Sequence, residues 1–193
     1  MGVIETDWFA PDRLFDGGYP DGLTSALRAL PNVLATVRAE LAALAPRLTL
    51  EIGPGDTPIA QAGEIVYLDV APWFLSRLSG ARVRGDLFAA PFAPQAFDLV
   101  VAADVLTHIR PEDRRRAVAR MTELGRALLL FNPEPGTHQV PDSRSPTLPV
   151  AEQLAQAGWD VAQRKFVAIT SGGEYVMRLL KATRPSAAAA PPG

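Results

Sequence analysis

Two glycines and two acids mark the part of the sequence that is best suited to binding a small molecule. Glu51 is followed by Ile52, Gly53, Pro54 and Gly55, and the next apolar run ends at Asp69. Glycines at this spacing let the chain turn tightly and let a ligand lie against bare backbone. A carboxylate at the end of the following strand can accept both hydroxyls of a ribose. The pattern predicts a site for a ligand that contains a nucleoside.

Two further acids, Asp86 and Asp104, follow the next two predicted strands. Because parallel strands end at one edge of a sheet, we expect these two carboxyl groups to converge there with Glu51 and Asp69. Four acids around one ligand suit a cation better than a pyrophosphate, which like charges would repel. Capping of local turns explains Asp86 and Asp104 as an alternative.

Three polar residues lie next to this predicted edge of the sheet. His108 follows the apolar run that precedes Asp104, and Asn132 and Glu134 follow the next run. An imidazole is suited to general-base catalysis near neutral pH, and equally to a structural hydrogen bond. Asn132 and Glu134 are candidates for binding a substrate, and turn formation explains them equally well.

The order of these motifs resembles that of the class I S-adenosylmethionine-dependent methyltransferases, in particular their type 11/12-like domain. The resemblance covers about residues 48 to 181. It implies a Rossmann-like fold and S-adenosyl-L-methionine as the cofactor. The four landmarks that carry it are Glu51-Ile52-Gly53-Pro54-Gly55, Asp69 at a strand end, Gly85-Asp86-Leu87, and the run from Phe97 to Asp104 with His108 after it.

The resemblance implies a role for each residue on the methionine side of the cofactor. Glu51 and the turn at residues 53–55 would serve the methionine end, and Asp69 would bind the ribose. Ala103 or Asp104 would lie near the methionine amino group.

The same resemblance implies contacts to the adenine. Val70 would pack on the ring, Asp86 would accept from its exocyclic amine, and Leu87 would supply a backbone contact. The implied cofactor residues are Glu51, Gly53, Pro54, Gly55, Asp69, Val70, Asp86, Leu87, Ala103 and Asp104.

Methyl transfer from a sulfonium depends mainly on holding the acceptor in line, because the leaving group is neutral. A base helps when the acceptor is a hydroxyl, and His108 or Asp104 is predicted to supply it. Tyr19, in an aromatic-rich loop at residues 7–21, is a further substrate candidate. We expect this loop to close over the pocket as a lid.

The elements that would position these residues alternate between strand and helix. They predict an α/β, Rossmann-like doubly wound fold with a mostly parallel seven-stranded sheet, an antiparallel C-terminal hairpin strand and helices on both faces. Strands are predicted at 48–52, 65–68, 82–84, 97–103, 127–131, 161–169 and 175–181. Helices are predicted within 24–45, divided at Pro31, and at 73–79, 111–124 and 147–157.

Two departures from the family pattern follow the glycine turn. Asp56, Thr57 and Pro58 stand where many members have a third glycine, and residues 60–63 leave room for about one or two helical turns. We therefore expect a shortened first crossover helix that begins near Pro58 after a side-chain cap.

Composition excludes several classes of site. The 193 residues suffice for one hydrophobic core. The formal net charge is -2, so the chain lacks the excess of basic residues that nucleic-acid binding proteins have. The chain has no cysteine, so disulfides and cysteine-based metal sites are excluded, and we expect no metal. No secretory signal and no membrane-spanning run is recognisable, which predicts a cytoplasmic location.

The organisation of the chain follows from these patterns. We expect residues 1–47 to form an N-terminal loop and helical lid or cap, 48–184 the S-adenosylmethionine-binding core, and 185–193 a disordered tail. The arginines between 110 and 120 are expected to form a solvated helix face rather than a nucleic-acid site.

Two other functions remain as alternatives to methyl transfer onto a small-molecule oxygen or nitrogen acceptor. A catalytically silent S-adenosylmethionine-binding or scaffold protein would keep the same fold and the same cofactor contacts. An NAD-binding oxidoreductase is less favoured, because Pro58 replaces the third glycine of G-x-G-x-x-G and no Tyr-x-x-x-Lys pair is present. The sequence carries no signal for oligomeric state.

Overall fold

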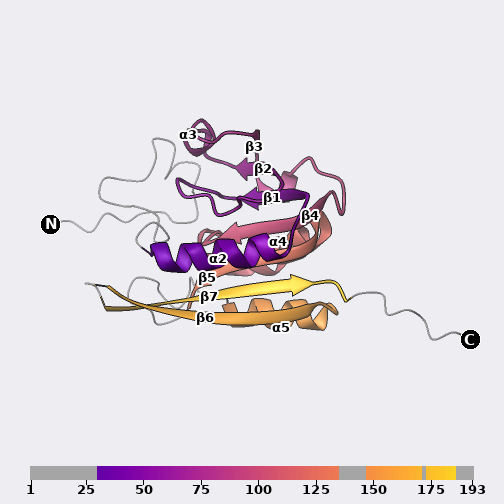
Figure 1. The fold of residues 1–193 in the computed structure, drawn as a ribbon. Coiled ribbons are helices and arrows are strands. Elements are labelled where there is room, and N and C mark those ends of the chain that lie inside the picture. Colours follow the sequence, from indigo (N-terminus) through magenta and orange to yellow (C-terminus); the bar gives the residue numbers. More distant parts are fainter. Residues whose placement is uncertain (1–29, 135–146, 171–172, 186–193) are drawn as a thin grey trace, which may run out of the picture.

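One mixed sheet forms the centre of the molecule in this computed structural model, which describes residues 30–134, 147–170 and 173–185. Seven strands of these described parts pair in the order β3-β2-β1-β4-β5-β7-β6 (Figure 1). Strand β7 runs antiparallel to β5 and β6, whereas the pairs among β1 to β5 are parallel. The strands are β1 Leu48–Ile52, β2 Glu64–Asp69, β3 Ala81–Arg84, β4 Phe97–Ala103, β5 Gly125–Pro133, β6 Asp160–Thr170 and β7 Gly173–Thr183. The predicted Rossmann-like fold with its antiparallel C-terminal hairpin is confirmed.

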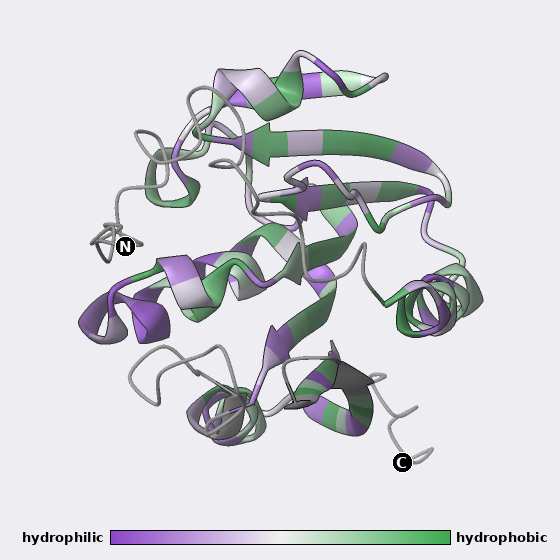
Figure 2. Ribbon diagram, turned by 90° about the vertical axis from the view of Figure 1, so that its left-hand side faces the viewer, coloured by the Kyte–Doolittle hydropathy of each residue, from purple (hydrophilic) through white to green (hydrophobic). Residues whose placement is uncertain are grey.

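Helices cover both faces of the sheet because its central strands are apolar on both sides. Helix α2 lies on one face, and α4 and α5 lie on the other (Figure 1). The described helices are α2 Pro31–Ala43, α3 Pro72–Leu75, α4 Pro111–Leu124 and α5 Thr147–Gln156, with short 3-10 helices η1 Leu87–Ala89 and η2 Leu106–His108. Figure 2 shows largely hydrophobic central strands, whereas the helices carry hydrophobic and hydrophilic residues together.

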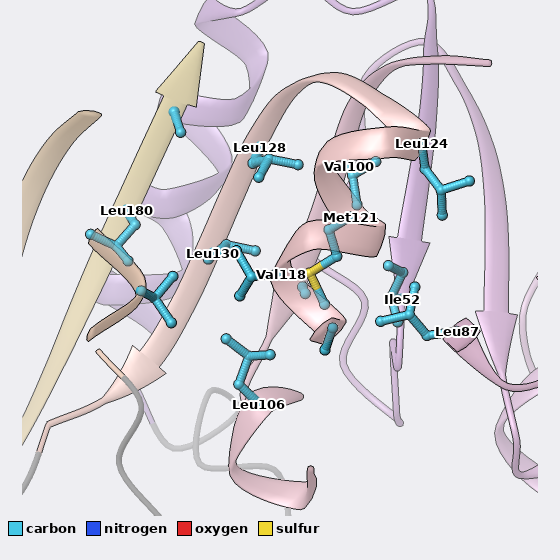
Figure 3. Close-up of a cluster of buried hydrophobic side chains, with 14 of the residues drawn as sticks. Ile52, Leu87, Val100, Leu106, Val118, Met121, Leu124, Leu128, Leu130 and Leu180 are labelled. Carbon is cyan, nitrogen blue, oxygen red and sulfur yellow. The ribbon is translucent and has the colours of Figure 1, made fainter. Parts of the chain in front are cut away.

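The larger core lies beneath α4 and α5. Val118, Met121 and Leu124 of α4 belong to one buried cluster with Val100 of β4 and Leu128 of β5 (Figure 3). Leu106 of η2 belongs to the same cluster and is fully buried. Packing on this face therefore fixes both α4 and the segment that follows β4.

The second core differs from the predicted division of the chain at residue 47. Leu34, Val37 and Leu41 of α2 pack with Leu129 and Phe131 of β5, so α2 belongs to the main fold rather than to a separate cap. Its start at Pro31 agrees with the predicted break at that residue.

The predicted short helix after β1 is wrong. Residues 53–63 contain no helix, although the connection has the expected length. Pro58 disfavours helical backbone at the residue before it, and side chains from β1 and α2 bind the following backbone directly, as described below. The predicted helix at 73–79 is also shorter, since α3 ends at Leu75.

Several predicted features lie outside the described residues. These are the aromatic loop at 7–21, Tyr19 within it, and most of the C-terminal tail. Among the described helices, none combines the length and the apolar character needed to cross a membrane.

Candidate functional site

The predicted acids meet where the order of the sheet reverses. Strand β1 pairs with β2 on one side and with β4 on the other, so the connections leave β1 in opposite directions. Glu51, Asp69 and Asp104 lie at the carboxyl ends of β1, β2 and β4, and Asp86 follows β3. Ligands of open α/β sheets bind at this kind of reversal.

The glycine turn connects β1 to both of its neighbours. Gly53 and Gly55 have φ angles of +58° and +55°, which favour glycine over other residues. The Gly53 amide donates to the Leu68 carbonyl at 2.8 Å. A Cβ atom at Gly53 would lie 2.7 Å from Cγ2 of Val105, in the loop after β4. The turn therefore fits only without a side chain at this position.

Asp69 lies directly beside this turn. Its side chain is 8% exposed, and Oδ1 accepts a hydrogen bond from the Ala71 amide at 2.8 Å. Burial raises the pKa of the Asp69 carboxyl to about 6, against the opposing effect of hydrogen bonds from the backbone of Ala71, Gly55 and Val70. The carboxyl predicted to bind ribose and the glycine turn therefore share a hydrogen bond.

Glu51 holds the loop that replaces the crossover helix. Its carboxyl is 1% exposed, with Oε1 accepting from the Ile59 amide at 2.7 Å and Oε2 from the Ala60 amide at 3.0 Å. Desolvation raises its pKa to about 7, while these two hydrogen bonds and the charge of Arg38 act in the opposite direction. Arg38 also donates from Nη2 to the Pro58 carbonyl at 2.7 Å. Both ends of the loop backbone at 58–60 are thus bound by side chains.

Arg38 was missed by the sequence analysis. It lies in α2 between the buried positions Val37 and Leu41, and a charged side chain beside apolar helical positions was the available signal. Its partner Pro58 is 20 residues away in the chain, so helical periodicity alone could not identify the contact.

Asp86 is exposed and caps η1, since Oδ1 accepts from the Phe88 amide at 2.8 Å. The alternative interpretation of Asp86 as a turn cap is therefore confirmed. The Asp86 residue remains exposed while it caps η1. Leu87, next to it, is buried. Val70 is half-buried after the end of β2.

Asp104 adopts a conformation that is uncommon for a residue with a side chain. Its φ angle is +56°, directly after Ala103 ends β4. Its amide donates to the Phe131 carbonyl of β5 at 2.7 Å. The Thr107 hydroxyl donates to the Asp104 carbonyl at 2.6 Å and to Oδ1 at 2.7 Å. Left-handed backbone here costs about 1–3 kcal/mol, and such strain gathers at functional sites.

His108 ends η2 and is half-buried. Its amide donates to the Val105 carbonyl at 3.0 Å, which completes the single turn that begins after Asp104. Thr107, which the sequence analysis did not single out, is buried and joins Asp104 to this turn.

Asn132 and Glu134 lie at the end of β5. The Asn132 side chain is 1% exposed, and neither Oδ1 nor Nδ2 has a hydrogen-bond partner within the part of the chain that the structure describes. Glu134 forms an ion pair with Arg178 of β7, the residue that pairs with Asn132 in the sheet. An unpaired buried amide costs about 1–3 kcal/mol, so this side chain needs a hydrogen-bond partner from water, from a ligand or from another part of the chain.

The comparisons with known proteins agree with this geometry. Residues 50–127, which run from β1 to β5, match the protein family described as "Methyltransferase domain". This part of the chain is a methyltransferase domain, as the resemblance in the sequence implies. The matched part of this methyltransferase contains the glycine turn, Asp69, Asp86 and Asp104.

Solved structures show the same fold at low sequence identity. Magnesium protoporphyrin IX methyltransferase (ChlM) from Synechocystis PCC 6803, with bound SAM, gives a TM-score of 0.65 at 17% identity, with 95% of this chain and 100% of that chain covered. The N-methyltransferase NodS from Bradyrhizobium japonicum WM9 gives 0.61 at 17% identity, with coverages of 81% and 96%. Comparison with curated protein sequences gives no match.

The buried Glu51 carboxyl predicts a measurable pH dependence of stability. Its pKa in the folded methyltransferase, about 7, lies above the ordinary value of 4.5. Its stabilising contribution is therefore fully present below pH 4.5 and is lost as the pH rises through 7. We expect the free energy of unfolding of the wild type, minus that of Glu51→Gln, to fall by about 3 kcal/mol over this range.

Urea unfolding at several pH values measures this difference. The raised pKa of Asp69 is common to both proteins and cancels in the subtraction. A difference that stays constant between pH 4.5 and 8 would show that Glu51 does not titrate in this range.

Proposed function

We propose that this methyltransferase acts on a small-molecule oxygen or nitrogen acceptor, bound above the ends of β4 and β5. The observation that carries the proposal is the Asn132 amide, which is 1% exposed and unpaired within the described residues. A small acceptor can present a single polar group to a side chain at this depth, whereas a flat macromolecular surface cannot.

The residues at the other side of the crevice fit the family's cofactor. The Asp69 carboxyl is buried, and its hydrogen bonds come from backbone amides, so ribose hydroxyls would supply further donors. Asp86 and Asp104 add carboxyl groups around the same edge, which suits a cationic ligand. When bound, S-adenosylmethionine supplies a methyl group on a positively charged sulfur that departs as a neutral thioether.

We assign the individual contacts as follows. Asp69 accepts from the ribose, and the turn at 53–55 presents its backbone to the methionine end. Val70 and Leu87 contact the adenine, and Asp86 accepts from the adenine amine. Ala103 and Asp104 lie nearest the methionine amino group.

Glu51 acts on the cofactor site through the loop. Both of its carboxylate oxygens accept amides of residues 59 and 60, so it fixes the chain that follows the glycine turn. Pro54 lies within that turn and limits its backbone freedom.

On the acceptor side, His108 holds or removes the proton of a hydroxyl or ammonium acceptor. Asp104 orients this segment, because Thr107 already donates to its Oδ1. Asn132 binds the acceptor, while Glu134 and Arg178 form the adjoining polar wall. Tyr19 would close the pocket as part of an N-terminal lid, although it lies outside the described residues. The chain's main task is to exclude water and to hold the acceptor in line.

Asp69→Asn tests the cofactor site through pH. Ionised Asp69 is the better acceptor for hydroxyls, and its pKa is about 6. We expect the wild type to bind S-adenosylhomocysteine about tenfold more weakly at pH 5 than at pH 7.5, because roughly a tenth of the carboxyl is ionised one pH unit below its pKa. Isothermal titration calorimetry measures the affinity.

Asp69→Asn should bind weakly at both pH values, whereas the exposed control Asp160→Asn should behave as the wild type. A wild-type affinity that is independent of pH, or an Asp69→Asn variant with unaltered affinity, would contradict the assignment.

Asn132→Leu tests the acceptor site, since leucine is apolar and of similar size. Removing an unpaired buried amide should leave the free energy of unfolding unchanged or raise it. Turnover should nevertheless fall tenfold or more, with S-adenosylhomocysteine affinity retained. Transfer of a labelled methyl group to a panel of phenols, carboxylates and amines measures turnover, and Asn32→Leu on the exposed first turn of α2 is the control.

Two results would overturn the proposed acceptor class. In the first, the wild type methylates a peptide or tRNA and no member of the small-molecule panel. In the second, Asn132→Leu turns over a small acceptor as fast as the wild type. Cofactor binding without transfer to any acceptor would favour the silent scaffold instead.

A further inference from the structure

Arg114 of α4 contradicts the expectation that the arginines at 110–120 form a solvated face. The residue is 9% exposed, while its neighbours Arg115 and Arg116 are exposed. Its Nε donates to the carbonyls of Leu106 and Ile109, both at 3.0 Å. These two carbonyls lie on either side of His108 in the chain.

Helix stability does not explain this placement. Arg114 is the fourth residue of α4, and the start of a helix favours negative charge, as Glu112 and Asp113 provide. Burial lowers the pKa of its guanidinium, which reflects a desolvation cost. Its Nη2 has no hydrogen-bond partner among the described residues. Burial and the helix N-terminus both disfavour a cation here, and only the charge of Glu112 opposes them, so the contacts of its Nε are the interactions that the position provides.

The hydrogen bonds of Arg114 stabilise the segment at residues 104–109, whose own helix is very short. Helix η2 spans three residues and has only two local backbone hydrogen bonds, from the His108 amide to the Val105 carbonyl and from the Ile109 amide to the Leu106 carbonyl at 3.3 Å, so further donors strengthen it. Arg114 supplies them from α4, which is anchored in the core by Ala117, Val118 and Met121. At the other end of the segment, Thr107 binds Asp104.

We propose that Arg114 is a positioning residue for methyl transfer, which fixes residues 104–109 so that His108 and Asp104 face the acceptor. The inference rests on the proposed function, which gives these two residues their acceptor-side roles. Arg114 itself touches neither cofactor nor acceptor.

Two substitutions separate the geometry of Arg114 from its charge. Arg114→Lys keeps the charge but loses the guanidinium nitrogen that reaches both carbonyls, and Arg114→Gln loses the charge as well. Arg115→Gln removes an exposed charge one residue away and serves as the matched control.

Two measurements are made on the whole chain. Amide hydrogen exchange at His108 and Ile109 should accelerate tenfold or more in both Arg114 variants, while exchange in α4 from Ala117 onward stays within twofold. The kcat for a small acceptor should fall tenfold or more, whereas the affinity for S-adenosylhomocysteine stays within twofold.

The proposal is overturned if exchange at His108 and Ile109 matches the wild type in both variants. It is also overturned if exchange accelerates equally along all of α4, which a merely structural role would produce, or if kcat is unchanged while the segment loosens. A wild type that methylates no small acceptor refutes the proposed function instead. The exchange at positions 108 and 109 then still decides whether Arg114 holds the segment.

Discussion

Burial of two carboxyl groups at the ends of β1 and β2 constrains the chain around them. A carboxyl removed from water is stable only where donors surround it. Glu51 obtains its donors from the amides of Ile59 and Ala60, and Asp69 obtains them from the backbone that follows β1 and the backbone that follows β2. The loop after β1 is consequently tied to its own strand and to β2. These hydrogen bonds hold the glycine turn in place although no helix follows it, so its backbone can still contact a ligand.

The proposed acceptor side, at the ends of β4 and β5, depends on a different kind of constraint. Asp104 is held in left-handed backbone by its hydrogen bond to Phe131 and by Thr107. Arg114 binds the carbonyls that follow, and the apolar face of α4 fixes Arg114 in turn. The left-handed backbone lies in the segment 104–109, and the buried cation of α4 is hydrogen-bonded to that same segment. The amide of Asn132, unpaired within the described residues, lies at the end of β5, the strand next to β4, and we proposed above that these groups serve the acceptor.

Much of this architecture could be predicted because its causes are local in sequence. The runs at 97–103 and 111–124 form β4 and α4 at the predicted bounds, since apolar residues on both strand faces and helical spacing each leave a direct pattern. The glycine turn and Asp69 were predicted for the same reason. The conformation of the loop at 53–63 was not predicted, because one of its hydrogen bonds joins Pro58 to Arg38 of α2, which is 20 residues away in the chain. Arg114 was missed because it is one of five arginines between residues 110 and 120, a pattern that predicts a solvated surface. Only tertiary packing buries Arg114.

The central claim is that the glycine turn and Asp69 bind opposite parts of one adenosyl ligand. A crystal structure of the protein with S-adenosylhomocysteine tests it most directly through the distances from the Asp69 carboxylate oxygens to the two ribose hydroxyls. The account predicts separations of about 2.5–3.0 Å, with the homocysteine end lying over residues 53–55. Adenosyl density elsewhere, or a ribose whose hydroxyls face away from Asp69, would contradict it.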